Sequence, residues 1–406
     1  MFSSPLGSCC HGVYAGLLKR RNCSYSLSTT HIFTTTRCRR LHPEPADQDS
    51  TGGVMIRLDT NAFLGRLSTK AAASRRPENV TFELTYGCNL RCVHCYNPTH
   101  RALPQELTTA EICALLKQIA DLGVLTVTFT GGEPSVRPDI GDILHYARRQ
   151  GLIIHLLTNA TRITTTFAKL LQEVGVSQIN VSIYGATDAI YEQMTGVAGS
   201  FRQFRQGLLN LTEADLPILV RMPVTTINCD EIHACRQLVE SLNTKFQYCL
   251  EIMTTTTGNR TPLQYRLNPQ KKIAIDQDLL PLREPPLARE SCSANQSFIE
   301  CACGQSQFAI TPYGEMNLCV AFPTPRYDLR KGTVKEGWEV LKQTFDHAQP
   351  TDRYECQTCD VRSYCRQGRS DAWLETGDMS TCLPHYKQWA ELEHRTHALL
   401  DPRRPA

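Results

Sequence analysis

The stretch Thr85-Tyr-Gly-Cys-Asn-Leu-Arg-Cys-Val-His-Cys-Tyr96 places Cys88, Cys92 and Cys95 in a C-x3-C-x2-C pattern. Three closely spaced thiolates can hold three irons of a [4Fe–4S] cluster and leave the fourth iron open, whereas a fully ligated cluster mostly transfers electrons. Zinc is the alternative, although zinc sites usually contain two C-x2-C pairs or histidines. The pattern therefore favours an iron–sulfur cluster with one open iron.

A second motif, Gly131-Gly132-Glu133-Pro134, follows a β-branched and aromatic run at 125–130 that is typical of a buried strand. Two glycines allow a backbone to approach a ligand closely. The carboxylate of Glu133 can accept a hydrogen bond from an ammonium group. The segment alone would be interpreted as a turn, but its place at the end of the strand after the cysteines favours a binding role.

Strand and helix patterns alternate from residue 80 to residue 253, which predicts an α/β fold with a parallel sheet and right-handed crossovers. A possible capping box, Thr108 with Glu111, marks the start of the first helix. The expected strands are 80–85, 125–130, 152–157, 178–183, 218–225 and 246–253, and the expected helices are 108–122, 140–149, 165–174, 201–214 and 231–242.

The two motifs resemble those of the radical S-adenosylmethionine (SAM) enzymes. The resemblance implies a six-stranded partial (β/α) barrel with its chemistry at the C-terminal strand ends. It implies that the three cysteines bind the SAM-binding [4Fe–4S] cluster and that the Gly-Gly-Glu segment binds the methionine end of SAM. The residues implied in the SAM site are Cys88, Cys92, Cys95, Gly131, Gly132 and Glu133.

Two further SAM contacts follow from the same resemblance. Ser182 matches a serine of the fourth strand, and His94 stands where the family usually has an aromatic residue beside the adenine. The family often has an arginine after the fourth strand, but this chain has Tyr191-Glu-Gln-Met-Thr-Gly196 there. Arg221 on the fifth strand is a candidate replacement.

A second cysteine array begins with Cys303-x10-Gly314-x4-Cys319, in which 308–319 is typical of a β-hairpin. The array resembles the SPASM domain, an auxiliary-cluster extension of radical SAM enzymes with a β-hairpin and short helices. The resemblance implies one auxiliary [4Fe–4S] cluster, with zinc as the alternative. The cysteines implied to hold it are Cys356, Cys359, Cys365 and Cys382.

A second auxiliary cluster is left open by the sequence. The resemblance assigns Cys303 and Cys319 to it, but Arg369 stands where the family has another cysteine ligand. Cys292 or Cys301 could supply a replacement ligand.

Composition, charge and the N-terminal segment complete the predicted domain organisation. With 406 residues, a net charge of +3 and 19 cysteines, it gives no case for nucleic acid or membrane binding and favours a reducing, cytoplasmic setting. Residues 1–54 are rich in Ser, Thr and Arg, which fits a transit peptide to an organelle or a start upstream of the true one. The expected parts are an extension (1–54), an arm (55–78), the radical SAM core (79–275), a linker (276–297), the SPASM domain (298–392) and a tail (393–406).

The resemblance implies an oxidoreductase that cleaves SAM to a 5′-deoxyadenosyl radical, which abstracts hydrogen from a substrate. SPASM proteins mostly act on ribosomally made peptides or protein side chains, so oxidative peptide maturation is expected. The alternatives are modification of a small tetrapyrrole-type cofactor and a non-catalytic iron–sulfur or zinc protein with the same fold. A flavodoxin- or ferredoxin-like electron donor and a separate peptide-recognition protein are the expected partners.

Overall fold

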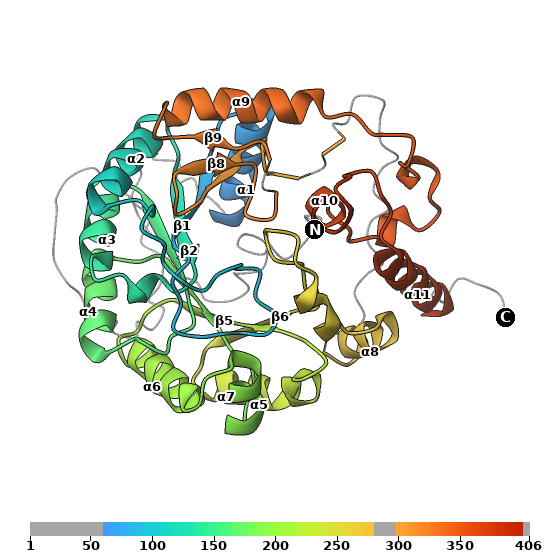
Figure 1. The fold of residues 1–406 in the computed structure, drawn as a ribbon. Coiled ribbons are helices and arrows are strands. Elements are labelled where there is room, and N and C mark those ends of the chain that lie inside the picture. Colours follow the sequence, from blue (N-terminus) through green and yellow to red (C-terminus); the bar gives the residue numbers. More distant parts are fainter. Residues whose placement is uncertain (1–59, 280–297, 300, 323, 401–406) are drawn as a thin grey trace, which may run out of the picture.

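Six parallel strands alternate with helices in the first part of the chain, as predicted. The computed structural model describes residues 60–279, 298–299, 301–322 and 324–400. The six strands belong to one nine-stranded sheet with the order β6-β5-β4-β3-β2-β1-β7-β8-β9 (Figure 1). The predicted extension, most of the linker and Cys292 lie outside the described residues. The α/β class and the partial (β/α) barrel are confirmed.

The barrel strands are β1 (Asn79–Thr85), β2 (Thr126–Gly131), β3 (Ile153–Thr158), β4 (Gln178–Ser182), β5 (Ile218–Pro223) and β6 (Lys245–Cys249). The predicted helices are α2 (Thr109–Asp121), α3 (Ile140–Arg149), α4 (Thr165–Val174), α6 (Ser200–Glu213) and α7 (Ile232–Ser241). Two more, α1 (Thr60–Ala73) and α5 (Asp188–Thr195), were not predicted.

The start of α2 agrees with the sequence prediction, and the end of β6 differs from it. The capping box of α2 is present: the Thr108 side chain accepts from Glu111 N at 3.3 Å, and the Glu111 carboxylate accepts from Thr108 N at 2.8 Å. The predicted sixth strand is too long, because β6 ends at Cys249 opposite Pro223 of β5. The last hydrogen bond between the two strands joins Val224 N to the Cys249 carbonyl oxygen at 2.8 Å.

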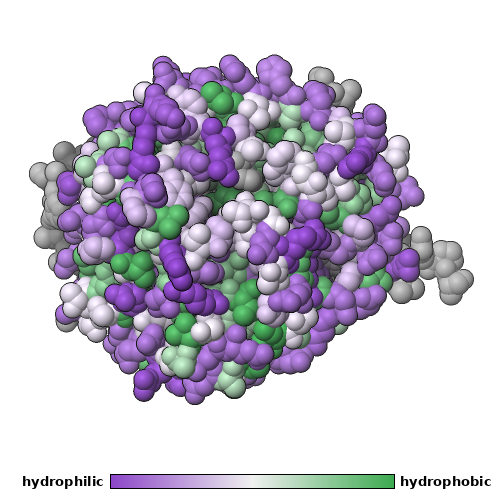
Figure 2. All heavy atoms as spheres, viewed as in Figure 1, coloured by the Kyte–Doolittle hydropathy of each residue, from purple (hydrophilic) through white to green (hydrophobic). Residues whose placement is uncertain are grey.

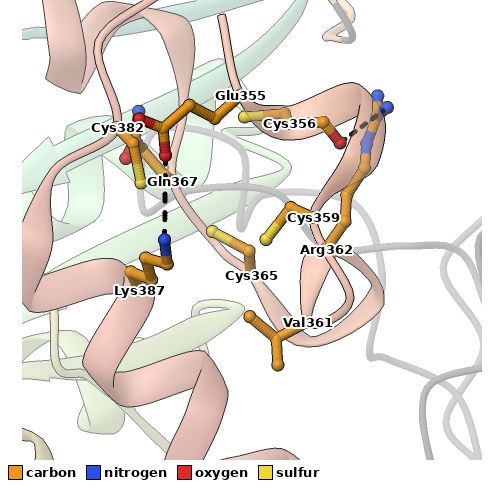
Figure 3. A pocket seen from close by; sticks show the side chains of 9 residues that line it. All are labelled: Glu355, Cys356, Cys359, Val361, Arg362, Cys365, Gln367, Cys382 and Lys387. Atoms are coloured by element: carbon orange, nitrogen blue, oxygen red, sulfur yellow. Dashed lines mark hydrogen bonds and ion pairs between the residues drawn. The ribbon is translucent and has the colours of Figure 1, made fainter.

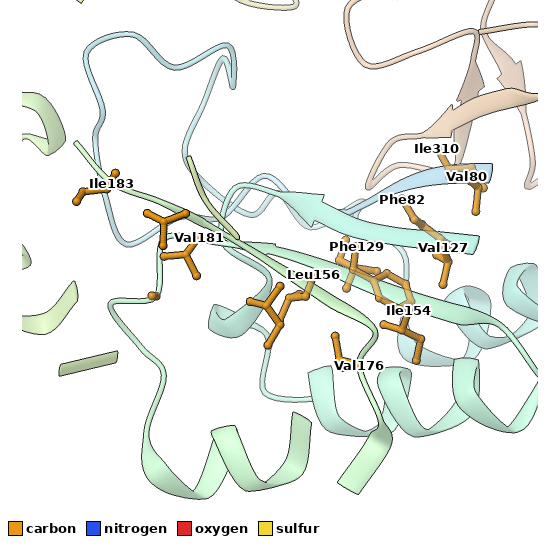
Figure 4. Packing of buried hydrophobic residues seen from close by; sticks show 14 of the residues in the cluster. Val80, Phe82, Val127, Phe129, Ile154, Leu156, Val176, Val181, Ile183 and Ile310 are labelled. Atoms are coloured by element: carbon orange, nitrogen blue, oxygen red, sulfur yellow. The ribbon is translucent and has the colours of Figure 1, made fainter. Parts of the chain in front are cut away.

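Side chains on the two sides of the barrel sheet differ in character. Phe82 and Phe129 are 0% exposed and belong to the apolar core between the strands and the helices (Figure 4). Alternate positions of the strands point to the other side. Glu83, Thr130 and Asn180 are polar but only 1%, 7% and 4% exposed. Because buried polar groups need partners, the inner side of the sheet is suited to polar contacts.

The C-terminal part extends the same sheet. β7 (Gln307–Ile310) pairs in parallel with β1, and the hairpin continues through β8 (Glu315–Asn317) to β9 (Tyr327–Asp328). The predicted turn is present, with Gly314 at φ +79°. The remaining helices are α8 (Pro269–Leu279), α9 (Val334–His347), α10 (Arg369–Thr376) and α11 (Pro384–Leu400).

Helix α8 packs against α11, so the barrel and the C-terminal part are joined here as well (Figure 1). The predicted domain boundary at 275 falls inside α8, and the one at 392 falls inside α11. The face of the molecule in Figure 2 is mostly hydrophilic, with apolar residues scattered between polar ones. None of the described helices combines the length and the apolar character needed to cross a bilayer.

Candidate active site and auxiliary cluster site

The cysteine motif forms a loop after β1 that rests on the end of α5. The N–H groups of Arg91 and Val93 donate to the carbonyl oxygens of Thr195 (2.8 Å) and Met194 (3.0 Å). Gly196 ends α5 with φ +66°, and a Cβ there would come within 3.1 Å of the Arg91 carbonyl oxygen. A left-handed glycine cap thus lets the helix end meet the loop, and α5 positions the cysteines.

The three thiols Cys88, Cys92 and Cys95 lie half-buried and close to one another in this loop. The N–H groups of Leu90 and Asn97 donate to the sulfurs of Cys88 and Cys95, both at 3.4 Å. Burial is the main cause that raises the pKa of Cys88 to about 11 and that of Cys95 to about 12. Metal coordination deprotonates such thiols, and hydrogen bonds to sulfur tune iron–sulfur clusters. The donor set therefore fits a cluster.

The Gly-Gly-Glu segment packs directly against the start of the cysteine loop. Gly132 N donates to the Thr85 carbonyl oxygen (2.7 Å), and Glu133 N donates to that of Gly87 (2.9 Å). A Cβ on Gly131 or Gly132 would overlap one of these oxygens, and Gly131 has φ +123°. The glycines thus let the segment lie close to the backbone of the cysteine loop, and their predicted approach to a ligand stays a prediction.

The Glu133 carboxylate is fully buried and accepts four hydrogen bonds at the strand ends. Oε1 accepts from Ser135 N (3.1 Å), Ser135 Oγ (2.6 Å) and Thr158 Oγ1 (2.8 Å), and Oε2 accepts from Asn159 N (2.7 Å). Burial raises the pKa of Glu133, and these donors act in the opposite direction. An ionised carboxylate has about four acceptor sites. Three of the four bonds fall on Oε1, so Oε2 has only the Asn159 N–H as a hydrogen-bond donor among the described residues.

Asn159 is a residue of this site that the sequence analysis did not select. Its side-chain Nδ2 lies 3.1 Å from Asn89 Oδ1 and 3.9 Å from the Cys88 sulfur. Its backbone N–H reaches Glu133, so Asn159 links the Gly-Gly-Glu segment to the cysteine loop. The available signal was its position, because polar residues at the C-terminal strand ends of such barrels tend to be functional.

Ser182 and His94, the other predicted SAM contacts, both meet Tyr184. The His94 and Tyr184 rings are 5.4 Å apart between centroids, and the Tyr184 hydroxyl contacts the Ser182 side chain and the Cys92 sulfur. Burial lowers the pKa of His94 to about 4, so its ring is neutral at pH 7. Arg221 is the register partner of Ser182 on β5. The structure brings these side chains together, and their contacts with SAM stay predictions.

Glu83 adds a buried carboxyl group on the inner side of β1. It accepts hydrogen bonds from the hydroxyls of Tyr96 (3.1 Å) and Tyr86 (3.3 Å). Burial raises the pKa of Glu83 to about 7, and the two phenols act in the opposite direction. The Tyr86 ring also meets Tyr313 of the C-terminal hairpin, with 5.5 Å between ring centroids. These aromatic contacts connect the cysteine loop to the C-terminal part.

The four cysteines of the expected auxiliary site line one hollow: Cys356, Cys359, Cys365 and Cys382. Figure 3 shows their sulfur atoms turned toward this hollow. The Gln367 side chain joins the segments that carry them, because it donates to Thr381 O (2.8 Å) and accepts from Leu383 N (2.7 Å). Burial is the largest cause that raises the pKa of Cys365 to about 11, and the neighbouring thiols add to it. Four thiols in this arrangement fit a cluster with four protein ligands.

The cysteines assigned to a second auxiliary cluster lie together, whereas Arg369 lies beside the four-cysteine site. Cys303 and Cys319 do lie together, and the Cys303 thiol contacts those of Cys301 and Cys319. Arg369, however, begins α10, and its Nη1 lies 3.8 Å from the Cys356 sulfur of the four-cysteine site.

Across the described ranges, no three His, Cys, Asp or Glu side chains are arranged to hold a single metal ion. Each thiolate of a cluster binds a different iron, so its ligands stand further apart than those of one ion.

Comparison with known proteins agrees with this geometry. Residues 82–239 match the model of the Radical SAM superfamily. The chain is 26% identical to the AdoMet-dependent heme synthase of Methanosarcina barkeri over 332 residues, which are 76% of this chain and 95% of that protein. It is 25% identical to the Mycofactocin maturase MftC of Mycobacterium tuberculosis over 319 residues, 74% of this chain and 80% of MftC. Streptococcus suis SuiB, in its crystal structure with the precursor peptide SuiA, has the same fold, with a TM-score of 0.62, 14% identity and 82% of each chain covered.

The matched region contains the cysteine loop, the Gly-Gly-Glu segment and most of the barrel. The matched residues therefore form a radical SAM domain. When bound, SAM and the [4Fe–4S] cluster of this family supply a 5′-deoxyadenosyl radical that takes a hydrogen atom from the substrate.

Proposed function

We propose that this enzyme oxidises a side chain of a ribosomally made peptide or of a protein. The observation that carries the proposal is the shared strand between the two cysteine arrays. β1 leads into the first array and pairs with β7, which begins the hairpin that leads to the second. A second redox centre in the same molecule suits an oxidation, because electrons removed from a substrate need an acceptor. The relationship to MftC, a maturase by name, supports a peptide substrate.

The residue roles in this proposal follow the geometry of the strand ends. Glu133 Oε2 binds the ammonium group of SAM, while Ser182 and His94 contact the rest of the molecule. Gly131 and Gly132 let the segment lie against the cysteine loop. The barrel then excludes water and positions one C–H bond of the substrate. The ligands of the SAM-binding cluster are Cys88, Cys92 and Cys95.

The auxiliary cluster is held by Cys356, Cys359, Cys365 and Cys382 in this proposal. Cys303 and Cys319, with Cys301, form a further candidate site. A flavodoxin- or ferredoxin-like protein supplies electrons, and a separate protein recognises the peptide.

A tetrapyrrole substrate is the second candidate. The match to a heme synthase extends over 95% of that protein, which favours this alternative. Both candidates use the same SAM site and the same auxiliary cluster, and they differ in what occupies the inner side of the barrel.

The test is anaerobic incubation of the reconstituted enzyme with SAM, dithionite and one candidate substrate at a time. The candidates are short peptides encoded beside the gene and a porphyrin with propionate side chains. We expect 5′-deoxyadenosine to form together with a peptide that has lost two hydrogen atoms. Conversion of the porphyrin, with no change in any peptide, would replace the first candidate by the second.

A further inference from the structure

Arg369 places a guanidinium group against a sulfur of the four-cysteine site. Its Nη1 donates toward the Cys356 sulfur at 3.8 Å and the Met379 carbonyl oxygen at 3.4 Å, and Nη2 donates to the Tyr354 hydroxyl at 3.3 Å. Its Cζ lies 4.7 Å from the centroid of the Tyr354 ring and 5.0 Å from that of Phe298. Two aromatic rings and three acceptors therefore hold the charge in one place, beside Cys356.

Arg362, which lines the same hollow, donates to the Cys356 carbonyl oxygen at 3.4 Å, and two other cations near the site pair with carboxylates. Lys387 pairs with Glu355 at 3.7 Å, and Arg366 pairs with Asp276 at 3.2 Å and with Glu393 at 3.0 Å. Arg369 has no such carboxylate partner in the described part of the chain. Its positive charge is therefore less neutralised than the charges of Lys387 and Arg366.

We propose that Arg369 raises the reduction potential of the auxiliary cluster and so makes it a better electron acceptor. Reduction adds negative charge to a cluster and its thiolates. An N–H donor and a positive charge beside one ligand stabilise that reduced state more than the oxidised state. The inference rests on the proposed function because it requires a cluster at this site, but it holds for either substrate class.

A potentiometric titration followed by EPR tests the inference. The full chain is reconstituted anaerobically with Cys88, Cys92 and Cys95 replaced by Ala, so that the signal of the SAM-binding cluster is absent. Arg369→Ala is expected to lower the midpoint potential. At a fixed applied potential, the ratio of reduced to oxidised cluster should fall on the order of tenfold, which corresponds to about 59 mV for a one-electron couple. The midpoint potential of Arg369→Lys, which keeps the charge, should lie between the midpoints of Arg369→Ala and the parent.

Arg353→Gln is the matched control, since it removes an exposed charge from the segment that leads to Cys356. An unchanged midpoint in Arg369→Ala, with iron and EPR signal retained, would overturn the inference. An equal shift in Arg353→Gln would also overturn it, because the effect would then come from net charge.

If Arg369→Ala fails to retain iron, Arg369→Gln and Arg369→Lys decide the question. A lower midpoint for Gln than for Lys supports the inference, and parental midpoints in both contradict it. A parent protein without any auxiliary EPR signal would instead refute the proposed function.

Discussion

Glu133 and Asn159 connect the Gly-Gly-Glu segment to the cysteine loop, the two motifs of the proposed SAM site, through a few hydrogen bonds. The sequence predicted Glu133, because its motif follows a recognisable strand. It did not predict Asn159, whose contact with Cys88 joins residues 71 positions apart. Local patterns identify such a strand end, but they do not reveal which distant side chain an amide will meet.

Replacing Glu133 by Gln should weaken SAM binding by about 1.5–3 kcal/mol, because a charge-assisted contact with the SAM ammonium is lost. Anaerobic calorimetry of the reconstituted enzyme measures this change. Ser135→Ala is the control, since it removes a donor to Oε1 but keeps the carboxylate charge. Equal SAM affinity of Glu133→Gln and the parent would argue against Glu133 as the ammonium ligand.

Glu83 should make the stability of the folded chain depend on pH. Burial raises its pKa from 4.5 to about 7. The folded state therefore binds this proton more tightly, and stability should fall by up to about 3 kcal/mol as the pH rises from 4.5 to 7. Urea unfolding of the anaerobic enzyme across this range should give a flatter profile for Glu83→Gln.

Glu111→Gln provides the control for this pH profile. The pKa of Glu111 is lowered to about 2, mainly by its hydrogen bond with Arg330, so Glu111 stays ionised across the range. Its replacement should leave the slope unchanged. Identical slopes for Glu83→Gln and the parent would show that Glu83 does not titrate in this range.

Among the secondary-structure elements, α5 and β7 contribute most to the site beyond what the sequence predicted. The six barrel strands followed from their apolar and β-branched runs. α5 has only eight residues, too few for a clear helical period. The parallel pairing of β7 with β1 joins Asn79 to Gln307, and no local pattern encodes a partner so distant in the chain.

Gly196→Ala should weaken the support that α5 gives to the cysteine loop. It should cost about 1 kcal/mol of stability, because alanine is strained at φ +66°. It should also speed the release of iron to a chelator, because the new Cβ would press on the Arg91 carbonyl oxygen.

Gly175→Ala is the matched control for this experiment. Gly175 caps α4 at φ +74°, and the nearest atom to its added Cβ is 3.9 Å away. It should lose a similar amount of stability in urea and release iron at the parental rate. Equal iron release from both variants would mean that α5 does not position the cluster loop.

For the whole molecule, the sheet unites two cysteine arrays that the sequence presents more than 200 residues apart. The sequence predicted both arrays, because cysteine spacing is a local signal. It identified Arg369 by its position in the spacing, but a spacing match does not fix the direction of a side chain at the start of a helix. The structure shows that this guanidinium lies beside Cys356 of the four-cysteine site.

Total iron should reach about eight atoms per reconstituted chain, since two of the thiol sets suit a four-iron cluster. Iron and sulfide analysis of the anaerobic protein gives this number. A reproducible content of about twelve would show that Cys301, Cys303 and Cys319, with a further ligand, complete a third cluster.

The most direct test of the account is SAM cleavage by a variant in which Cys88, Cys92 and Cys95 are all replaced by Ala. The parent enzyme, reduced anaerobically, should produce 5′-deoxyadenosine. The triple variant should produce none, yet keep about four irons at the auxiliary site. Continued formation of 5′-deoxyadenosine by the triple variant would contradict the assignment of radical SAM chemistry to this loop.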